Sequence, residues 1–209
     1  MKIIVIVLIL FIYPIYAYDN FTQKSIVKFE KQYGKKRVNT ITLWDNMIQK
    51  AKVASDLQKL KYVNDFFNSI RYITDIKHWH QNDYWASPFE FVGTNGGDCE
   101  DYAIAKYFTL LKVGIAEDKL RIAYVKLKHR YTRYDEAHMV LLYFHQLNMI
   151  PIVLDNVNKK LQLASKRVDL KLIYSFNAKG LWEAKNKGRE HIKRGSNNLQ
   201  KWKKLIEKI

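Results

Sequence analysis

The sequence predicts an α+β fold in which an N-terminal group of helices and a central helix pack on an antiparallel sheet. Three observations predict it. Apolar residues recur at helical spacing from about residue 22 to 73. A second helical pattern runs from Cys99 to Val113 and ends at Gly114, a residue type that often follows a helix. Several strand-like segments follow it, and helices followed by consecutive strands are typical of the α+β class.

The N-terminal lobe, about residues 22–73, is defined by its apolar spacing. Its middle segment repeats apolar residues at three- and four-residue steps, namely Ile41, Trp44, Ile48 and Ala51. Such a stripe predicts a helix with one buried face. The next helix is expected to start near Ser55 or Asp56, because either residue suits an N-cap.

Residues 75–97 lack a periodic pattern and are expected to form a loop. The segment contains two tryptophans, two histidines, Pro88 and three glycines. A long irregular segment inside a compact domain is usually functional. It opens the expected catalytic core, about residues 75–185.

The sheet is expected from segments of strand-like composition after residue 114. The clearest are 120–127, 137–144 and 150–155, and weaker signals lie at 170–176 and 181–183. We expect these strands to form an antiparallel meander. A short amphipathic helix at about 198–209 is expected to close the chain.

The first 17 residues resemble a secretory signal peptide, which leaves 18–209 as a single domain. Lys2 precedes an apolar run from Ile3 to Ile12, and Ala17 is a small residue at the expected cleavage site. The ten apolar residues would span only ~15 Å of a hydrocarbon core of ~30 Å, so cleavage is favoured over anchoring. We therefore expect an exported protein with no stable membrane span after cleavage.

The chain is strongly basic. Its 36 Lys and Arg against 20 Asp and Glu give a net charge of +16. This balance suggests anionic partners such as lipid, cell-wall polymer or an acidic protein. Export argues against nucleic acid, and the scattered basic residues favour a solvated surface over a dedicated patch.

Cys99, the single cysteine, is the first candidate catalytic residue. It cannot form an internal disulfide, and an exported thiol needs either a chemical role or deep burial. It follows Gly96 and Gly97 at the start of the predicted central helix, where free N–H groups and aligned peptide dipoles favour a thiolate. The neighbouring carboxylates in "GGDCEDYA" oppose the thiolate unless something offsets them.

His138 and Asp155 are the second and third candidates. If the two strands that carry them form a hairpin that turns at Gln146 and Leu147, they stand directly opposite each other on one face. Taken singly, each has a structural explanation: a core histidine with a backbone partner, and a turn aspartate. Together with Cys99 they favour a triad in which Asp155 orients the His138 imidazole.

Four strings make the sequence similar to a known family. They are "NDYWA" at 82–86, "GGDCEDY" at 96–102, "AHMV" at 137–140 and "LDN" at 154–156. Over about residues 38–182 the chain resembles the bacterial transglutaminase-like cysteine proteinases, in particular the LapG-type periplasmic adhesin proteases. The resemblance implies a papain-like or transglutaminase-like core and a Cys99–His138–Asp155 triad.

The resemblance also implies calcium. Asp98, Glu100 and Asp101 offer the hard oxygen ligands that Ca²⁺ takes, and Asp118, or Glu117 in its place, is a further candidate. A bound cation would offset the repulsion that these carboxylates impose on a thiolate. The alternative is that the acids only complement the helix N-terminus.

Trp85 is a candidate for the cleft. Its indole N–H is a donor that suits an oxyanion, and a packing role is equally open.

The implied function is calcium-dependent cleavage of a large surface adhesin near its N-terminus, at a dialanine site, in the periplasm. The implied partners are that adhesin and an inner-membrane receptor for cyclic di-GMP, which sequesters the protease. Two alternatives remain open from the residues: a transglutaminase-like acyltransferase, and an exported basic binding module with an inert thiol.

Overall fold

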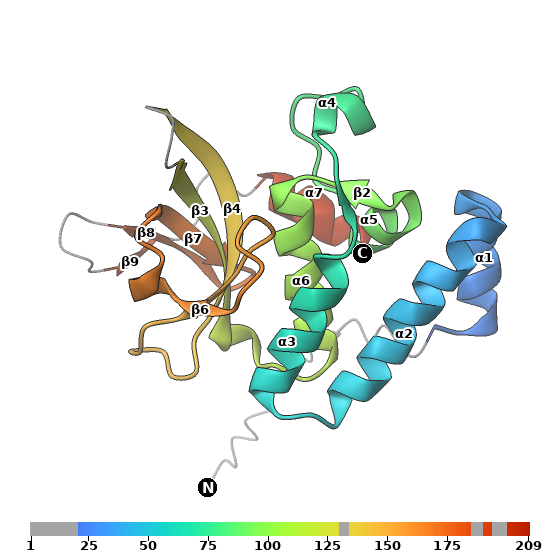
Figure 1. Ribbon diagram of the computed structural model, residues 1–209, viewed down its shortest axis with the longest axis horizontal. Coiled ribbons are helices and arrows are strands. Elements are labelled where there is room, and N and C mark those ends of the chain that lie inside the picture. Colours follow the sequence, from blue (N-terminus) through green and yellow to red (C-terminus); the bar gives the residue numbers. More distant parts are fainter. Residues whose placement is uncertain (1–20, 130–133, 185–189, 194–199) are drawn as a thin grey trace, which may run out of the picture.

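The computed structural model describes residues 21–129, 134–184, 190–193 and 200–209 (Figure 1). It confirms the α+β class, with helices on one side of a mainly antiparallel sheet. The expected signal peptide, 1–17, lies outside the described residues. Within the described part of the chain, no helix combines the length and the apolar character needed to cross a membrane.

Three helices form the N-terminal lobe: α1 (Gln23–Tyr33), α2 (Val38–Lys52) and α3 (Asp56–Phe67), with the 3-10 turn η1 (Lys35–Arg37) between the first two. The predicted stripe of α2 is buried, since its four apolar residues are at most 3% exposed. Ser55 is the N-cap of α3 and forms a capping box with Gln58, which explains where this helix starts.

The expected loop at 75–97 is more ordered than predicted. It contains α4 (Asp75–His78) and α5 (Pro88–Thr94), and its last glycines form β2 (Gly96–Gly97), which pairs in parallel with β1 (Arg71–Tyr72). The loop prediction was therefore wrong for these residues. The missed signal was local, because Ser87 and Glu90 form a capping box around Pro88.

Helix α6 (Cys99–Lys112) is the centre of the fold. It lies between the sheet and the N-terminal helices, and packs against α3, β3 and β4 (Figure 1). Gly114 follows it with φ +89°, as the predicted C-terminal glycine requires. The 3-10 turn η2 (Glu117–Lys119) then leads into the sheet.

The main sheet has seven strands among the described residues, in the order β6-β5-β4-β3-β7-β8-β9. The strands are β3 (Leu120–Lys128), β4 (Asp135–Tyr143), β5 (Ile152–Leu154), β6 (Gln162–Leu163), β7 (Leu170–Asn177), β8 (Gly180–Ala184) and β9 (Glu190–Lys193). The five predicted strands are confirmed. The simple meander was wrong, because after β6 the chain returns through the turn η3 (Ala164–Lys166) and β7 pairs with the free edge of β3.

Two strands of the main sheet were not predicted. Strand β6 has only two residues, and β9 contains three charged or polar residues in four, so neither carries a clear apolar pattern. The predicted C-terminal helix is confirmed as α7 (Gln200–Lys208), which buries Trp202 and Leu205. Trp202 stacks on Phe108 of α6, with ring centroids 5.4 Å apart.

Candidate active site

The start of α6 places the single cysteine. Asp98 is the N-cap, and its side chain and that of Asp101 form a capping box around the first turn. Gly97 has to be glycine, because a Cβ there would overlap the Asp101 side chain and lie 2.8 Å from the Phe91 ring. The backbone can therefore pass close to α6 and turn sharply into it, which leaves Cys99 as the first residue of the helix.

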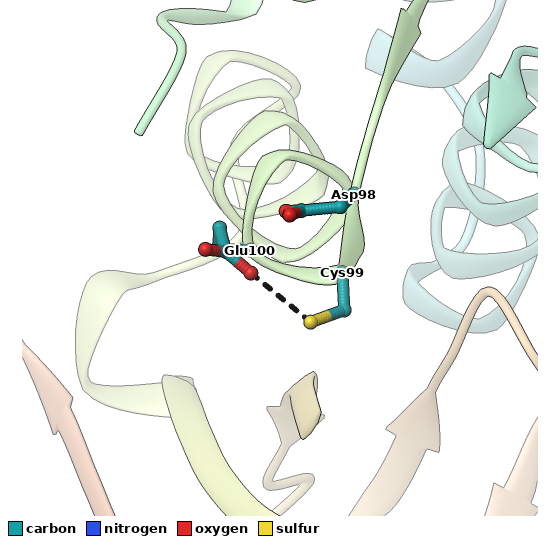
Figure 2. Close-up of side chains that lie close together, drawn as sticks. All are labelled: Asp98, Cys99 and Glu100. Carbon is teal, nitrogen blue, oxygen red and sulfur yellow. Dashed lines mark hydrogen bonds between the residues drawn. The ribbon is translucent and has the colours of Figure 1, made fainter. Parts of the chain in front are cut away.

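The Cys99 thiol is directed toward Glu100 in this structure. Its Sγ donates a hydrogen bond of 3.0 Å to Glu100 Oε2 (Figure 2). Burial raises the pKa of the thiol well above its ordinary value, and repulsion by Glu100 adds to the effect. The helix N-terminus alone does not produce a thiolate here, because burial and the carboxylates outweigh it.

His138 and Asp155 are brought together as predicted, although by a different register. Strands β4 and β5 pair Leu141 with Leu154 and Leu142 with Val153, which is two residues away from the predicted pairing. A shift of two keeps each side chain on its face of the sheet. His138 Nε2 and Asp155 Oδ1 are 2.8 Å apart, and both side chains are buried.

Asp155 is held in its ionised form. Burial alone would raise its pKa, but the hydrogen bond and charge of His138 outweigh this, assisted by the Val157 N–H and the Arg167 guanidinium. The net effect holds the pKa of Asp155 far below its usual range. A buried carboxylate that stays charged can fix the tautomer and orientation of the imidazole bonded to it.

The two halves of the site meet between α6 and β4. The Met139 backbone N–H lies against the Cys99 sulfur, where it lowers the pKa of the thiol and partly opposes burial. Met139 follows His138 directly, so the sulfur lies beside the strand that carries the imidazole. Among the contacts of the described residues, the thiol donates to Glu100 and has no hydrogen bond to His138.

A buried polar chain links α6 to Asp155 through α3. Lys106 Nζ, on α6, donates to Asn68 Oδ1 at 2.8 Å, and Asn68 Nδ2 donates to the Asp155 carbonyl at 2.9 Å. Lys106 and Asn68 are both buried. These bonds fix the position of the segment after β5 relative to the helix that carries Cys99.

Carboxylates converge beside the thiol. Single ligand oxygens of Asp75, Asp98 and Asp101 lie within 4.8 Å of one another, and so do those of Asp75, Asp83 and Glu100. The sequence predicts that Asp98, Glu100 and Asp101 lie together. The prediction missed Asp75, which the pairing of β1 with β2 and the turn of α4 bring into the cluster.

Within the described part of the chain, Asp83 of this cluster pairs with Lys201, whereas Asp75, Asp98, Glu100 and Asp101 have no ion pair. Burial raises the pKa of Asp75 to about 6 and that of Asp98 to about 8, where Glu100 adds to the effect. Burial also raises the pKa of Asp101 well above its usual value. Asp75 Oδ1 and Asp98 Oδ1 are buried without a hydrogen-bond partner. Unpartnered buried oxygens among crowded carboxylates fit the ligand set of a hard cation.

Asp118 and Glu117 are not brought to this cluster. Both lie in η2, beyond the far end of α6. The 14 residues of α6 correspond to a length of roughly 20 Å. Glu117 instead accepts a hydrogen bond from the Tyr107 hydroxyl at 2.9 Å. The structure therefore does not bring Asp118 together with Asp98, Glu100 and Asp101, whereas Asp75 does join them.

Trp85 packs within the fold. Its ring stacks on Phe176 of β7 with centroids 5.9 Å apart and an angle of 12° between the planes. It belongs to the residues that pack around the main core. The geometry supports the packing role that the sequence left open and shows no donor role.

The chain is similar to known proteins over most of its length. Residues 27–183 match the family described as bacterial transglutaminase-like cysteine proteinase. The structure is similar to that of Legionella pneumophila LapG, with a TM-score of 0.74 and 40% identity over 88% of this chain and 96% of the other. The calcium-bound form of that protein gives a TM-score of 0.75, with 40% identity over 88% of this chain and 97% of the other. No match was found among curated proteins.

Proposed function

Because the chain belongs to the bacterial transglutaminase-like cysteine proteinases, we propose that it is a calcium-dependent endopeptidase with Cys99, His138 and Asp155 as its triad. One observation carries the proposal. The His138–Asp155 hydrogen bond of 2.8 Å is buried, and Met139, the residue after His138, lies against the sulfur of the single cysteine of the chain.

In the proposed mechanism, the His138 ring transfers the proton. Asp155 accepts from Nε2, which leaves Nδ1 as the atom that exchanges a proton with Cys99. The side chain of Cys99 rotates from Glu100 toward His138 and gives its proton to Nδ1. The sulfur then bonds to the substrate carbonyl carbon, and the resulting oxyanion accepts hydrogen bonds from the backbone N–H groups at the start of α6.

The remaining steps return the enzyme to its starting state. Nδ1–H gives the proton to the leaving amine as the C–N bond breaks, which leaves a thioester on Cys99. Water, deprotonated by the same nitrogen, attacks the thioester and releases the acid and the thiol. An amine in place of water would complete acyl transfer instead, which is the alternative activity.

Calcium is proposed for the carboxylate cluster. Asp75, Asp98, Glu100 and Asp101 would hold the ion, with Asp83 at the exposed side. A bound Ca²⁺ supplies positive charge that neutralises the carboxylates around the thiol. The unpartnered Oδ1 atoms of Asp75 and Asp98 support this assignment.

The cellular role follows from similarity. The proposed substrate is a large repeat-rich surface adhesin, cut near its N-terminus in the periplasm, with control of biofilm attachment as the outcome. The proposed regulator is an inner-membrane receptor that sequesters the protease when cyclic di-GMP is high. The 40% identity to LapG and the predicted signal peptide support this role.

The test uses the mature chain, 18–209, and a fragment with the N-terminal region and dialanine site of a surface adhesin from the same genome. We expect the wild type to cut the fragment in calcium and to stop in EGTA, and Cys99→Ala to be inactive but folded. Mass spectrometry separates hydrolysis from acyl transfer. Cleavage by Cys99→Ala, or an inert wild-type thiol toward iodoacetamide in calcium, would contradict the proposal.

A further inference from the structure

Arg167 contacts the far side of the proposed catalytic carboxylate. It follows the turn η3 and is 2% exposed. Its Nη2 donates to Asp155 Oδ2 at 2.7 Å, and Nη2 and Nε also donate to Asp169, at 2.7 Å and 3.0 Å. No motif in the sequence singled out this arginine, which lies 12 residues after Asp155.

The two oxygens of Asp155 have separate donors. Oδ1 accepts from the His138 ring at 2.8 Å and from the Val157 N–H at 3.0 Å. Oδ2 accepts from Arg167. A carboxylate held from both sides cannot rotate about its bond to Cβ without breaking a charge-assisted hydrogen bond. The arginine therefore fixes the plane in which Oδ1 meets the imidazole.

We infer that Arg167 is a positioning residue of the proposed triad, which acts through Asp155 to hold the His138 ring and touches no substrate. The inference rests on the proposed function, because it takes His138 as the base. It adds a fourth residue to the machinery, in the chain order Cys99, His138, Asp155, Arg167.

The guanidinium group is suited to this role by shape as well as by charge. Its planar fork holds Asp155 and Asp169 at the same time, and a lysine has only one nitrogen to offer. The Asp169 side chain is 36% exposed, whereas that of Asp155 is buried. Asp169 therefore holds the outer edge of the guanidinium group. Lys106 approaches Asp155 from α6 as a second cation, but its hydrogen bond goes to Asn68.

Stability alone does not explain the pair. The side chains of Arg167 and Asp155 are 1% and 0% exposed. Buried ion pairs are costly to desolvate, and apolar replacements of similar volume are often as stable. A pair that orients a reacting group has a reason to be kept even where it adds little to the free energy of unfolding.

The experiment compares Arg167→Ala and Arg167→Lys with Arg121→Lys as the matched control. Arg121 is also buried, at 7% exposure, but it packs over the Phe144 and Trp182 rings, away from Asp155. For each protein, ¹⁵N NMR of the His138 ring reports its tautomer without any substrate, with His138→Gln used for assignment. Cleavage of the adhesin fragment in calcium then gives kcat and KM separately.

We expect Arg167→Ala to lower kcat by roughly 10- to 100-fold with little change in KM, and to give a mixed His138 tautomer. Arg167→Lys should recover part of kcat. Arg167 lines a cavity of about 520 Å³, so guanidinium ion added at low concentration should enter beside the truncated side chain and restore part of the rate. Arg121→Lys should keep the wild-type tautomer and kcat.

The outcomes are separable. A wild-type tautomer and kcat in Arg167→Lys and Arg167→Ala, with only a lower melting temperature, would overturn the inference. If Arg167→Ala does not fold, Arg167→Lys decides by the same readouts. If the wild type fails to cut the fragment but the tautomer still changes in the Arg167 variants, the proposed function fails and the positioning role stands.

Discussion

His138 and Asp155 form a 2.8 Å hydrogen bond although they are not directly opposite each other in the sheet. In the register of β4 and β5, Leu141 faces Leu154, which places Asp155 two residues out of line with His138. Diagonal neighbours on one face lie within reach of long side chains. The Asp155 carboxylate, held by Arg167 from behind, reaches the imidazole along this diagonal.

Asp155→Asn should disable catalysis while the fold persists. The amide carries no charge to favour the reactive tautomer of His138, so we expect kcat to fall at least about 100-fold. Peptide cleavage in calcium measures it.

The control is Asp65→Asn. Asp65 forms an exposed ion pair with Lys61 on α3, and such pairs contribute about 0–1 kcal/mol. Equal losses of kcat in the two variants would argue against a role for Asp155 in the triad.

Asp75→Asn should weaken calcium binding. One of its oxygens already accepts the Tyr84 N–H at 2.5 Å, and an amide oxygen can keep that bond, so the fold should survive. The variant loses a charged ligand from both carboxylate groups in which Asp75 takes part. Isothermal titration with calcium should show a clear loss of affinity.

Asp118→Asn is the matched variant for that titration. Asp118 is exposed in η2, at the opposite end of α6 from the cluster, so its calcium affinity should equal that of the wild type. The assignment of the cluster would be wrong if Asp118→Asn lost affinity and Asp75→Asn did not.

The calcium-free protein should lose stability as the pH rises from about 5 to about 7. Free carboxyl groups titrate near pH 4, whereas burial raises the pKa of Asp75 to about 6 and of Asp98 to about 8. In this window the folded state therefore binds more protons than the unfolded state, so stability falls with pH. Two groups oppose the trend, because burial lowers the pKa of His78 and lowers that of Lys106 to about 7, at the upper end of the window.

Melting temperatures in EGTA across this pH range measure the effect. Calcium should raise the melting temperature more at pH 7 than at pH 5, because protons compete with the cation for the same oxygens. An apo protein that becomes more stable between pH 5 and 7 would contradict the account.

Gly97→Ala should disrupt the start of α6. The added Cβ would overlap the Asp101 side chain and press on Phe91, and overpacking of this kind costs about 1–3 kcal/mol or more. We expect a lower melting temperature together with lost activity.

Gly34→Ala is the comparison for this effect. Gly34 has φ +86° and ψ 156°, a backbone conformation that essentially only glycine adopts, but open space surrounds the position of a Cβ, so its variant should lose about 1–3 kcal/mol of stability and keep its activity. A Gly97→Ala protein as stable and active as Gly34→Ala would show that the close approach has no such importance.

Local sequence patterns were sufficient for most of the elements. The α2 stripe, the Ser55 cap, the helix from Cys99 and the five main strands follow from spacing and composition. The capping box at Ser87 was also local, and it was missed because the glycines and tryptophans around it suggested a loop. The return of β7 to β3 was beyond such patterns, because strand order depends on which edge is free after the sheet forms.

The candidate site likewise contains features that local sequence predicted and features that depend on distant segments. Because side chains alternate between the two faces of a strand, the sequence placed His138 and Asp155 on one face. A shift of register by two residues leaves both side chains on that face. Asp118 was a candidate ligand because it follows the end of the predicted helix at Gly114, but α6 carries it away from the cluster. Asp75 and Arg167 were missed because they join the site from segments 24 residues before Cys99 and 12 residues after Asp155.

The sequence by itself determined the class of fold, the helix that starts at Cys99 and the face of the sheet that His138 and Asp155 share. These depend on short-range spacing, which the chain carries in any conformation. Only the tertiary structure decided that the thiol is protonated against Glu100, that Asp75 completes the acidic cluster and that Arg167 holds Asp155. Burial and the contacts between distant segments set these features, because desolvation and charge act through space and not along the chain.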